Sequence, residues 1–549
     1  MNSQSDQNVQ LGVYASDVES AMAELSRRDV VARIWSGDHT VWSPDPTETA
    51  DRLGWLTVID NMRDEFPSLT RFAVEVKEEG YRHVVLLGMG GSSLGPEVLR
   101  QTFGSADGYP EVIVLDSTAP ASVQAVTDAI DPATTLFLVS SKSGSTIEPN
   151  VFYSHFRRLV EQNIGEGQAG RHFVAITDSG TALAELGKRE GFRHVFSAQP
   201  DIGGRYSILS HFGLAPAALT GIDLTELLDR ADYMLARCGA DVPLRDNPGA
   251  WLGAALAALS SEGRDKLTVL TSPSVDSFGL WAEQLIAESL GKEGRGIVPI
   301  SDEPAVAPEK YGDDRVFAYL RVGGDDNAAN DNLAATLNAA GHPVIRMDLA
   351  DGYNLAAEFF RWEFATAVAG AIIGVRPFDQ PNVQAAKDAT DAALTAVGDS
   401  QILPKSPETS SFDALMDGVK PGDYVAIMAY VHQTPEVDQA VRDLRRAIIE
   451  RHGAATTLGY GPRFLHSTGQ LHKGGPNSGV FVQFTSDHPA DIPIPGRPYT
   501  FGVLVGAQAL GDLRALQATG RRVARVDLGS DELGAIRELT LSIRTPTDG

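Results

Sequence analysis

The sequence predicts an α/β protein built from doubly wound parallel sheets, and three observations support this. Short apolar runs of strand length alternate with helix-like segments along most of the chain. Glycine-rich or hydroxyl-rich turns follow two of these runs, as expected where a parallel strand passes into a helix. The 549 residues suffice for several domains, and a hydrophobic fraction of 43% excludes a largely disordered chain.

The first 80 residues are expected to form a helical segment, because the pattern from residue 17 to about 80 is helical with Ser, Asp and Pro breaks. Residues 81–240 then form the first predicted α/β domain. Its predicted strands are residues 83–87, 112–115, 136–140 and 173–177, with a helix at 96–101.

Residues 241–400 repeat the same alternation and form the second predicted domain. The predicted helices are residues 250–260, 278–290 and 355–373, and the predicted strands are residues 267–271, 315–322 and 344–349.

Residues 401–549 form a third predicted α/β piece, which begins with a Pro/Ser/Thr-rich linker at 401–413. Strands are predicted at residues 424–430, 479–485, 501–505 and 523–528, with a helix at 436–452.

The charge balance limits the partners that the protein could bind. Forty-six Lys and Arg residues against 72 Asp and Glu residues give a net charge of −26. This charge repels nucleic acids and anionic membranes at long range, so neither is expected as a partner. A small phosphorylated substrate remains possible, because local amides and one or two cations can hold a phosphate.

The compartment expected from the sequence is the cytoplasm. Cys238 is the single cysteine, so neither an intramolecular disulfide nor a cysteine zinc site can form. The first ten residues do not resemble a secretory signal. The longest apolar run, residues 364–375, falls short of the roughly 20 residues that span a bilayer.

Two turns in the first predicted domain are candidate phosphate sites. Residues 87–96 (LGMGGSSLGP) contain glycines directly after a strand, which let a ligand approach the backbone closely. The turn has neither the GK[ST] ending of a P-loop nor the GxGxxG order of a dinucleotide site. Residues 140–146 (SSKSGST) carry five hydroxyls and one lysine after another strand, and the carboxyl ends of parallel strands meet at one edge.

Three further segments contain residues suited to chemistry. In residues 201–207 (DIGGRYS), two glycines precede Arg205 in a tight turn. Glu288 ends an amphipathic helix just before a glycine, where a carboxylate is more often simply solvated. In residues 376–387, a proline-bounded turn opens a helix, with Gln380 and Lys387 on either side.

Taken together, these five segments resemble the phosphoglucose isomerase family, whose signatures they match in family order across about residues 88–387. The second domain and residues 459–477 look closest to the isomerase half of fused transaldolase/phosphoglucose isomerase proteins. The resemblance implies two sugar-isomerase (SIS-type) domains, with residues 401–549 as an α/β extension that supplies part of the site.

The resemblance also implies roles for individual residues. Glu288 matches the base that carries a proton between C2 and C1 through a cis-enediol, and Arg205 matches the cation that stabilises the enediolate. Gln380 and Lys387 match residues at the sugar end, and Lys387 matches one member of the pair that opens the sugar ring. The positions that match the phosphate cradle are Gly91, Ser92, Ser141, Lys142, Ser143 and Thr146.

The sequence departs from the family pattern in two places. The family's ring-opening histidine follows the catalytic glutamate in an HxxxQL-type segment, but residues 301–322 contain no histidine. A similar string begins at His466, so we hypothesise that the tail folds back and supplies His466, with Gln470 one turn along. Gln384 stands where many relatives have glutamate, which should alter local hydrogen bonding rather than abolish catalysis.

The implied activity is the interconversion of glucose 6-phosphate and fructose 6-phosphate, a step of glycolysis and gluconeogenesis. No cofactor and no obligatory metal are expected, because an enediol proton transfer needs no redox group and the histidines lack metal-ligand spacing. Two alternatives stay open: an isomerase for mannose 6-phosphate or sulfoquinovose, and a non-catalytic sugar-phosphate-binding protein. A homodimer is implied by the resemblance.

Overall fold

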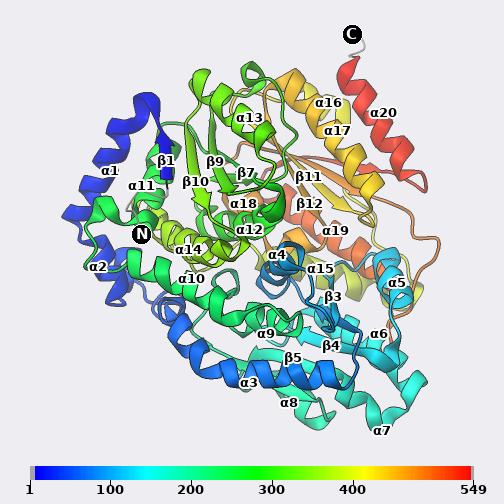
Figure 1. The fold of residues 1–549 in the computed structure, drawn as a ribbon. Helices are drawn as coiled ribbons and strands as arrows, with labels where there is room; N and C mark the ends of the chain where they lie inside the picture. The colour runs from blue at the N-terminus through cyan, green and yellow to red at the C-terminus, as the bar shows by residue number, and fades with distance from the viewer. Residues whose placement is uncertain (1–6, 546–549) are drawn as a thin grey trace.

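The computed structural model describes residues 7–545, which form three separate sheets with helices on their faces (Figure 1). All strand pairs are parallel except the one that involves the first strand, β1. This arrangement confirms the predicted α/β class. The three sheets follow one another along the chain, apart from β1, which joins the second sheet from the amino-terminal end.

The first sheet has the strand order β3-β2-β4-β5-β6. Its strands are β2 (His83–Leu87), β3 (Glu111–Leu115), β4 (Thr135–Ser140), β5 (Phe173–Asp178) and β6 (His194–Ala198). The four predicted strands are confirmed to within one residue at each end. The sequence analysis missed β6, because this edge strand alternates exposed polar and buried apolar residues and forms no apolar run.

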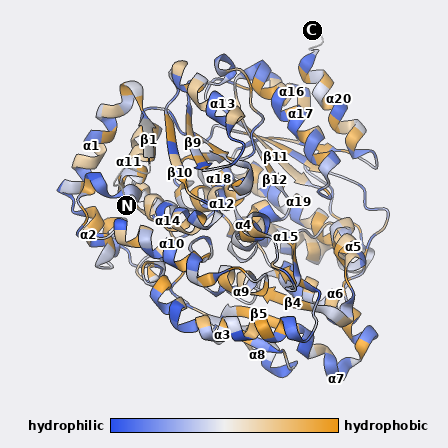
Figure 2. Ribbon diagram, viewed as in Figure 1, coloured by the Kyte–Doolittle hydropathy of each residue, from blue (hydrophilic) through white to orange (hydrophobic). Residues whose placement is uncertain are grey.

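Ten helices precede or accompany this sheet in the chain. They are α1 (Ala15–Arg27), α2 (Val30–Trp35), α3 (Val58–Glu78), α4 (Leu94–Phe103), α5 (Pro120–Ala129), α6 (Ile147–Ile164), α7 (Glu166–Ala169), α8 (Ala182–Arg189), α9 (His211–Leu219) and α10 (Leu224–Arg237). Figure 2 shows the outer helices α3 and α8 as largely hydrophilic and the strands β4 and β5 as hydrophobic. Strands with helices on both faces are expected to be apolar throughout.

The second sheet has the order β1-β10-β9-β7-β8. Its strands are β1 (Gln7–Gln10), β7 (Lys266–Thr271), β8 (Val298–Ile300), β9 (Arg315–Val322) and β10 (Val344–Leu349), and its helices are α11 (Pro248–Ser261), α12 (Phe278–Leu290), α13 (Ala328–Ala339) and α14 (Leu355–Ile373). The three predicted strands and the helices at 278–290 and 355–373 are confirmed. Helix α14 is apolar on nearly all sides because it is buried over almost its whole length.

The third sheet has the order β12-β11-β13-β14 and is fully parallel. Its strands are β11 (Tyr424–Tyr430), β12 (Ala455–Tyr460), β13 (Gly479–Thr485) and β14 (Arg522–Asp527). The helices in this part of the chain are α15 (Gln384–Val397), α16 (Phe412–Asp417), α17 (Pro435–His452), α18 (Gly469–Gly474), α19 (Phe501–Ala518) and α20 (Glu532–Arg544).

The strand predicted at residues 501–505 is wrong, because these residues form the first turns of α19. The hydroxyl of Thr500 caps this helix by accepting from the backbone N–H of Val503 at 3.2 Å. A short apolar run cannot be distinguished from a buried helix by its periodicity alone. The sequence analysis also missed β12, whose two threonines and one glycine interrupt the apolar pattern.

The carboxyl-terminal third shares its cores with the other two sheets. Ala393 and Leu394 of α15, with Phe501 of α19, pack in the same cluster as Val85 and Leu87 of the first sheet. Another cluster joins Ala287 of α12, with residues of β8, to the third sheet. The third sheet is therefore packed firmly against the elements that carry the predicted site.

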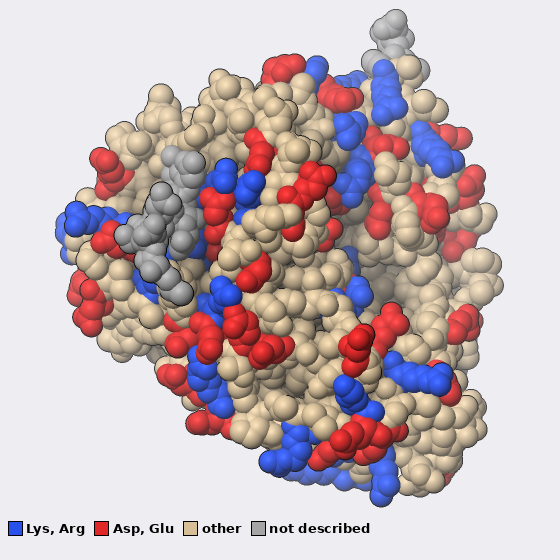
Figure 3. All heavy atoms as spheres, viewed as in Figure 1, with Lys and Arg blue, Asp and Glu red and all other residues tan. Residues whose placement is uncertain are grey.

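The surface carries acidic and basic side chains interspersed over the face seen in Figure 3. Among residues 7–545, no helix combines the length and the hydropathy that crossing a membrane requires.

Candidate active site

The glycine-rich turn after β2 meets two segments that are distant in sequence. A Cβ atom on Gly91 would lie 1.9 Å from the carbonyl oxygen of Gly204, so the two turns touch backbone to backbone. Gly90 has a φ of +54°, and a Cβ on it would lie 2.6 Å from the carbonyl oxygen of His466. Ser92 ends this turn and is buried.

The hydroxyl-rich loop after β4 gathers its side chains at the amino terminus of α6. The Ser141 hydroxyl donates to the Thr146 hydroxyl at 3.0 Å, and the Ser145 hydroxyl donates to that of Ser143 at 3.0 Å. Thr146 directly precedes α6, an 18-residue helix without a side-chain cap at its amino terminus, where backbone amides can bind an anion.

Lys142 does not point into this group of hydroxyls. Its Nζ donates to Asp178 Oδ2 at 2.6 Å, at the end of β5, and to the carbonyl oxygen of Pro200 at 3.0 Å. The sequence analysis matched Lys142 to the phosphate cradle, and in this structure its ammonium group is paired with a carboxylate.

Glu288 and Arg205 come together in the interior. Arg205 lies in the short 3-10 turn Gly204–Tyr206 and is 3% exposed, and Glu288, in the last turn of α12, is 7% exposed. The distance from Arg205 Nε to Glu288 Oε2 is 3.8 Å. Gln380 completes the group, because its Oε1 accepts from Arg205 Nη2 at 3.1 Å.

The carboxyl-terminal part of the chain connects to Glu288 at His466. Its Nε2 lies 3.0 Å from Glu148 Oε1, and its carbonyl oxygen accepts from Gln284 Nε2 at 2.9 Å. The Gln284 side chain also donates to Glu288 Oε2 at 3.0 Å, so one amide joins the predicted base to the tail. Gln508 of α19 donates to Glu148 Oε1 at 2.7 Å.

Glu148 is buried, yet its environment favours the charged form. Burial alone would raise its pKa, but the charge and hydrogen bond of His466 outweigh this and hold the pKa of Glu148 below its usual value. Lys387 lowers the pKa of Glu148 as well, so its exposed side chain lies within electrostatic range of the pair.

Gln470 acts as a structural link between the tail and the rest of the site. Its Nε2 donates to the carbonyl oxygen of Gly291 at 3.0 Å and to Asn382 Oδ1 at 2.8 Å. Its Oε1 accepts from the backbone N–H of Asn382 at 2.8 Å. All its polar atoms are engaged, and the side chain is fully buried.

The sequence analysis did not identify Glu148, Gln284 or Gln508. Gln284 could have been found, because it stands one helical turn before Glu288 on the same face of α12. Glu148 gave only a weak signal, since an acidic residue in the first turn of a helix is common. Gln508 was hidden by the wrong strand prediction for the start of α19.

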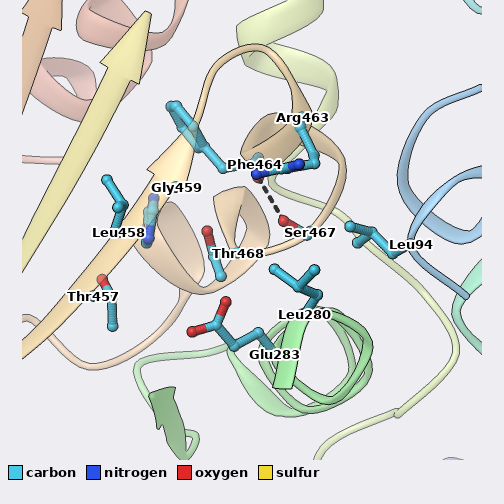
Figure 4. Close-up of a pocket in the computed structure, with 11 residues that line it drawn as sticks. Leu94, Leu280, Glu283, Thr457, Leu458, Gly459, Arg463, Phe464, Ser467 and Thr468 are labelled. Atoms are coloured by element: carbon cyan, nitrogen blue, oxygen red, sulfur yellow. Dashed lines mark hydrogen bonds between the residues drawn. The ribbon is translucent and has the colours of Figure 1, made fainter. Parts of the chain in front are cut away.

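A pocket lies between α12 and the segment that runs from β12 to α18 (Figure 4). It has a volume of about 410 Å³ including its solvent-filled mouth. In Figure 4, Glu283 and Leu280 extend from α12 towards Thr468. Burial raises the pKa of Glu283 to about 7, and its Oε1 accepts from the backbone N–H of Ser301 at 2.9 Å. This carboxyl group does not face Arg205.

Within residues 7–545, no three or more His, Cys, Asp or Glu side chains are grouped as metal ligands.

Residues 60–292 match the family model described as phosphoglucose isomerase. A glucose-6-phosphate isomerase of Rubrobacter xylanophilus is 30% identical over 385 residues, which cover 61% of this chain and 88% of the relative. One from Staphylococcus saprophyticus is 28% identical over 393 residues, which cover 64% of this chain and 88% of the relative.

The fold has a counterpart among solved structures. The crystal structure of a glucose-6-phosphate isomerase from Chlamydia trachomatis superposes with a TM-score of 0.59 at 19% identity, over 69% of this chain and 86% of that one. The sequence match to the Rubrobacter relative covers most of that protein and agrees with the family match and with the order of the five segments. The chain therefore belongs to the phosphoglucose isomerase family.

Proposed function

We propose that the protein is an aldose–ketose isomerase that interconverts glucose 6-phosphate and fructose 6-phosphate. The observation that supports this most is the buried approach of Glu288 to Arg205 at 3.8 Å, beside the tail segment that carries His466. The relatives named glucose-6-phosphate isomerase support the same activity. The reaction would belong to glycolysis and gluconeogenesis.

Glu288 is the proposed base. In the open-chain aldose, its carboxylate takes the proton from C2 while the C1 carbonyl oxygen becomes an enediol oxygen. The same carboxyl then returns the proton to C1, and the proton of the C2 hydroxyl passes to the C1 oxygen, so that the C2 oxygen becomes the ketose carbonyl. Negative charge develops on the two oxygens during this transfer, and the Arg205 guanidinium is placed to stabilise it.

His466 is the proposed acid/base for ring opening, with Lys387 as the other member of the pair. Opening a pyranose requires a proton on the ring oxygen and removal of the proton from the C1 hydroxyl. The hydrogen bond to Glu148 would hold the imidazole in one orientation. Gln284 and Gln380 would then bind sugar hydroxyls beside Glu288 and Arg205.

The phosphate would bind at the two turns of the first sheet. We assign this role to the hydroxyls of Ser141, Ser143 and Thr146, together with the free amides at the start of α6. Gly91 and Ser92 belong to the neighbouring turn. Because the Lys142 ammonium is paired with Asp178, we propose that Lys142 contributes its backbone to the loop rather than a free charge.

A substrate panel tests the proposal. The wild-type protein is assayed with glucose 6-phosphate, fructose 6-phosphate, mannose 6-phosphate and sulfoquinovose. We expect rapid interconversion of the first two. Turnover of mannose 6-phosphate or sulfoquinovose in their place would contradict the proposed substrate, and turnover of none of the four would contradict an isomerase.

The Glu288→Gln variant tests the assignment of the base, and Glu283→Gln is its matched control. Both residues are buried carboxyls of α12, but they lie on different faces. E288Q should lose about 10²- to 10⁴-fold in kcat, which is the usual size of a general-base contribution. E283Q should keep the wild-type rate. An equal loss in the two variants would show that damage to α12 explains the effect.

We also propose that the protein acts as a homodimer in the cytoplasm. The family resemblance supports the dimer, and a net charge of −26 agrees with a protein that stays in solution. Light scattering on the purified protein would give a mass near twice that of the 58.6 kDa chain. A mass equal to one chain would contradict the dimer.

A further inference from the structure

A buried lysine lies directly behind the proposed catalytic pair. Lys292 follows α12 by two residues and is 1% exposed. Its Nζ donates to the carbonyl oxygen of Arg376 at 2.6 Å, to Asp379 Oδ1 at 2.6 Å and to the carbonyl oxygen of Asp379. All three acceptors belong to one turn, residues 376–380, which follows α14.

The same turn holds the guanidinium of Arg205. The carbonyl oxygen of Phe378 accepts from Arg205 Nη2 at 2.9 Å. The carbonyl oxygen of Asp379 accepts from Nη1 at 3.3 Å and from Nη2 at 3.2 Å. Arg205 and Lys292 therefore share one acceptor, although 87 residues separate them in the chain.

The Asp379 carboxylate connects the turn to two cations. Its Oδ1 accepts from Lys292, and its Oδ2 pairs with Arg376 Nη2 at 2.8 Å. Asp379 is only 4% exposed, and its ion pair with Lys292 is buried on both sides, whereas Arg376 is partly exposed. The ion pairs hold the turn through the Asp379 side chain, while the backbone carbonyls of Phe378 and Asp379 accept from Arg205.

Burying the charged amine of Lys292 costs free energy. Burial and the neighbouring charge of Arg205 lower its pKa to about 7, although Asp379 acts in the opposite direction. A well-packed apolar side chain at a buried ion-pair position is often neutral or stabilising. Stability alone therefore does not explain why an amine occupies this position.

We propose that Lys292 is a positioning residue for Arg205. By holding the turn at residues 376–380, its amine aims the Phe378 and Asp379 carbonyls at the guanidinium. The guanidinium is thereby kept near Glu288, where charge develops during the reaction. This inference rests on the proposed function, because it assigns to Arg205 the stabilisation of the enediolate.

A double-mutant cycle tests the connection between the two residues. Lys292→Met should lower kcat by about 100-fold, the size expected when a catalytic group is misplaced by about 1 Å. The KM should change less than kcat, because the hydroxyls proposed to bind the phosphate lie in the loop after β4 and outside the turn at residues 376–380. In an Arg205→Lys background, the same K292M change should cost about twofold or less, because its effect acts through the arginine.

Losses that simply multiply in the double variant would overturn the proposal, because they would show that Lys292 acts independently of Arg205. If K292M does not fold, the milder variant Asp379→Asn tests the same connection. It keeps the Asp379 carbonyl but weakens the ion pairs, and it should lower kcat by about tenfold in the wild-type background and very little beside R205K. A D379N loss of equal size in both backgrounds would likewise overturn the proposal.

Lys266→Met is the matched control. Lys266 is also buried, at 2% exposure, and its Nζ donates to Asp265 Oδ1 and to the carbonyl oxygen of Gly422 at 2.7 Å each. It lies in β7, and none of its hydrogen bonds or ion pairs among the described residues involves Arg205 or Glu288. K266M should lower the melting temperature but leave kcat within about twofold of wild type. An equal loss of kcat in K266M would overturn the proposal.

A crystal structure of K292M gives a readout that does not depend on activity. We expect the turn at residues 376–380 to move and at least one of the Arg205 hydrogen bonds to Phe378 and Asp379 to be lost. If all of them are kept with Lys292 removed, the positioning role is wrong. Failure of the proposed function would instead appear as wild-type protein that converts no hexose 6-phosphate.

Discussion

Buried ionisable groups near α12 differ in whether they have partners. Glu288 faces Arg205, and Glu148 faces His466. Glu363 of α14 is fully buried, and neither of its carboxyl oxygens has a hydrogen-bond partner among the described residues. A buried carboxylate without a partner is very costly, so it is kept neutral instead. Glu288 and Glu148 thus differ from Glu363 in having a polar partner in the interior.

Glu148 and His466 give a prediction that separates ring opening from proton transfer. The exchange between the α and β anomers of glucose 6-phosphate requires ring opening but no transfer from C2. We expect His466→Ala to slow this exchange by about 10²-fold or more and Glu288→Gln to leave it nearly unchanged. Exchange NMR measures it directly. Anomer exchange at the wild-type rate in H466A would contradict the assignment.

Glu363 gives a prediction about pH and stability. Burial raises its pKa well above the usual value, so the folded state keeps the proton while the unfolded state loses it above about pH 4.5. The free energy of unfolding should therefore fall by about 1.4 kcal/mol per pH unit above that pH, as long as the folded carboxyl stays protonated.

Glu363→Gln removes this dependence, because glutamine is neutral in both states. Relative to wild type, E363Q should be increasingly stable as the pH rises from 5 to 8, as measured by urea denaturation. Glu78→Gln, at an exposed position of α3, is the control and should show no such trend. A constant difference between E363Q and wild type would contradict a neutral Glu363.

At the scale of elements, the site depends on how closely two glycine turns approach each other. Gly91→Ala places a methyl group where the Gly204 carbonyl oxygen lies, so the turns must separate. We expect G91A to lose about 1–3 kcal/mol of stability, as overpacked positions do, and about 100-fold in kcat, because the turn of Arg205 moves.

Gly203→Ala is the control for this prediction. Gly203 stands next to Gly204, has a φ of −68°, and a Cβ on it would meet no atom within 4 Å. G203A should keep the activity and the melting temperature of wild type. Equal behaviour of G91A and G203A in both assays would show that the contact between the turns does not matter.

Some strands and helices could be predicted from the sequence, and others could not. Apolar runs predicted β2, β4, β9, β11 and β13 almost to the residue, because both faces of these strands are largely buried. Periodicity could not identify β6 and β12, which are edge strands with mixed sequences, or distinguish the start of α19 from a strand.

Within the site, motifs identified the residues of strand ends and turns, but not their partners. Contacts join Arg205 to Glu288 and to Gln380, and each of these residues belongs to a segment that the sequence analysis had identified as a candidate. The direction of the Lys142 side chain could not be predicted, because Asp178 stands 36 residues further along the chain. The position of Gln508 depends on how the third sheet packs on the first, which no local pattern encodes.

At the scale of the whole molecule, each of the three sheet regions supplies part of the proposed site. The hydroxyl-rich loop follows the first sheet's β4, Glu288 lies on α12 beside the second sheet, and His466 precedes β13 of the third. Gln284 joins Glu288 to the carbonyl oxygen of His466 in the same chain, and His466 lies 3.0 Å from Glu148 at the start of α6. We therefore expect each chain to carry a complete site even within a dimer.

Mixing two inactive variants tests this prediction. E288Q and H466A chains, co-expressed and purified together, should show no more activity than the two variants measured separately. If partners exchanged these residues, a random mixture of dimers would recover about one quarter of the wild-type activity. Recovery of that size would contradict a site built from one chain.

Transfer of a hydrogen by Glu288 is most directly tested by isotope exchange. In deuterated water, wild-type protein that converts glucose 6-phosphate to fructose 6-phosphate should incorporate solvent deuterium at C1 of the product, as followed by NMR. The account predicts that E288Q abolishes this incorporation while E283Q does not. Deuterium incorporation by E288Q at the wild-type rate would contradict it.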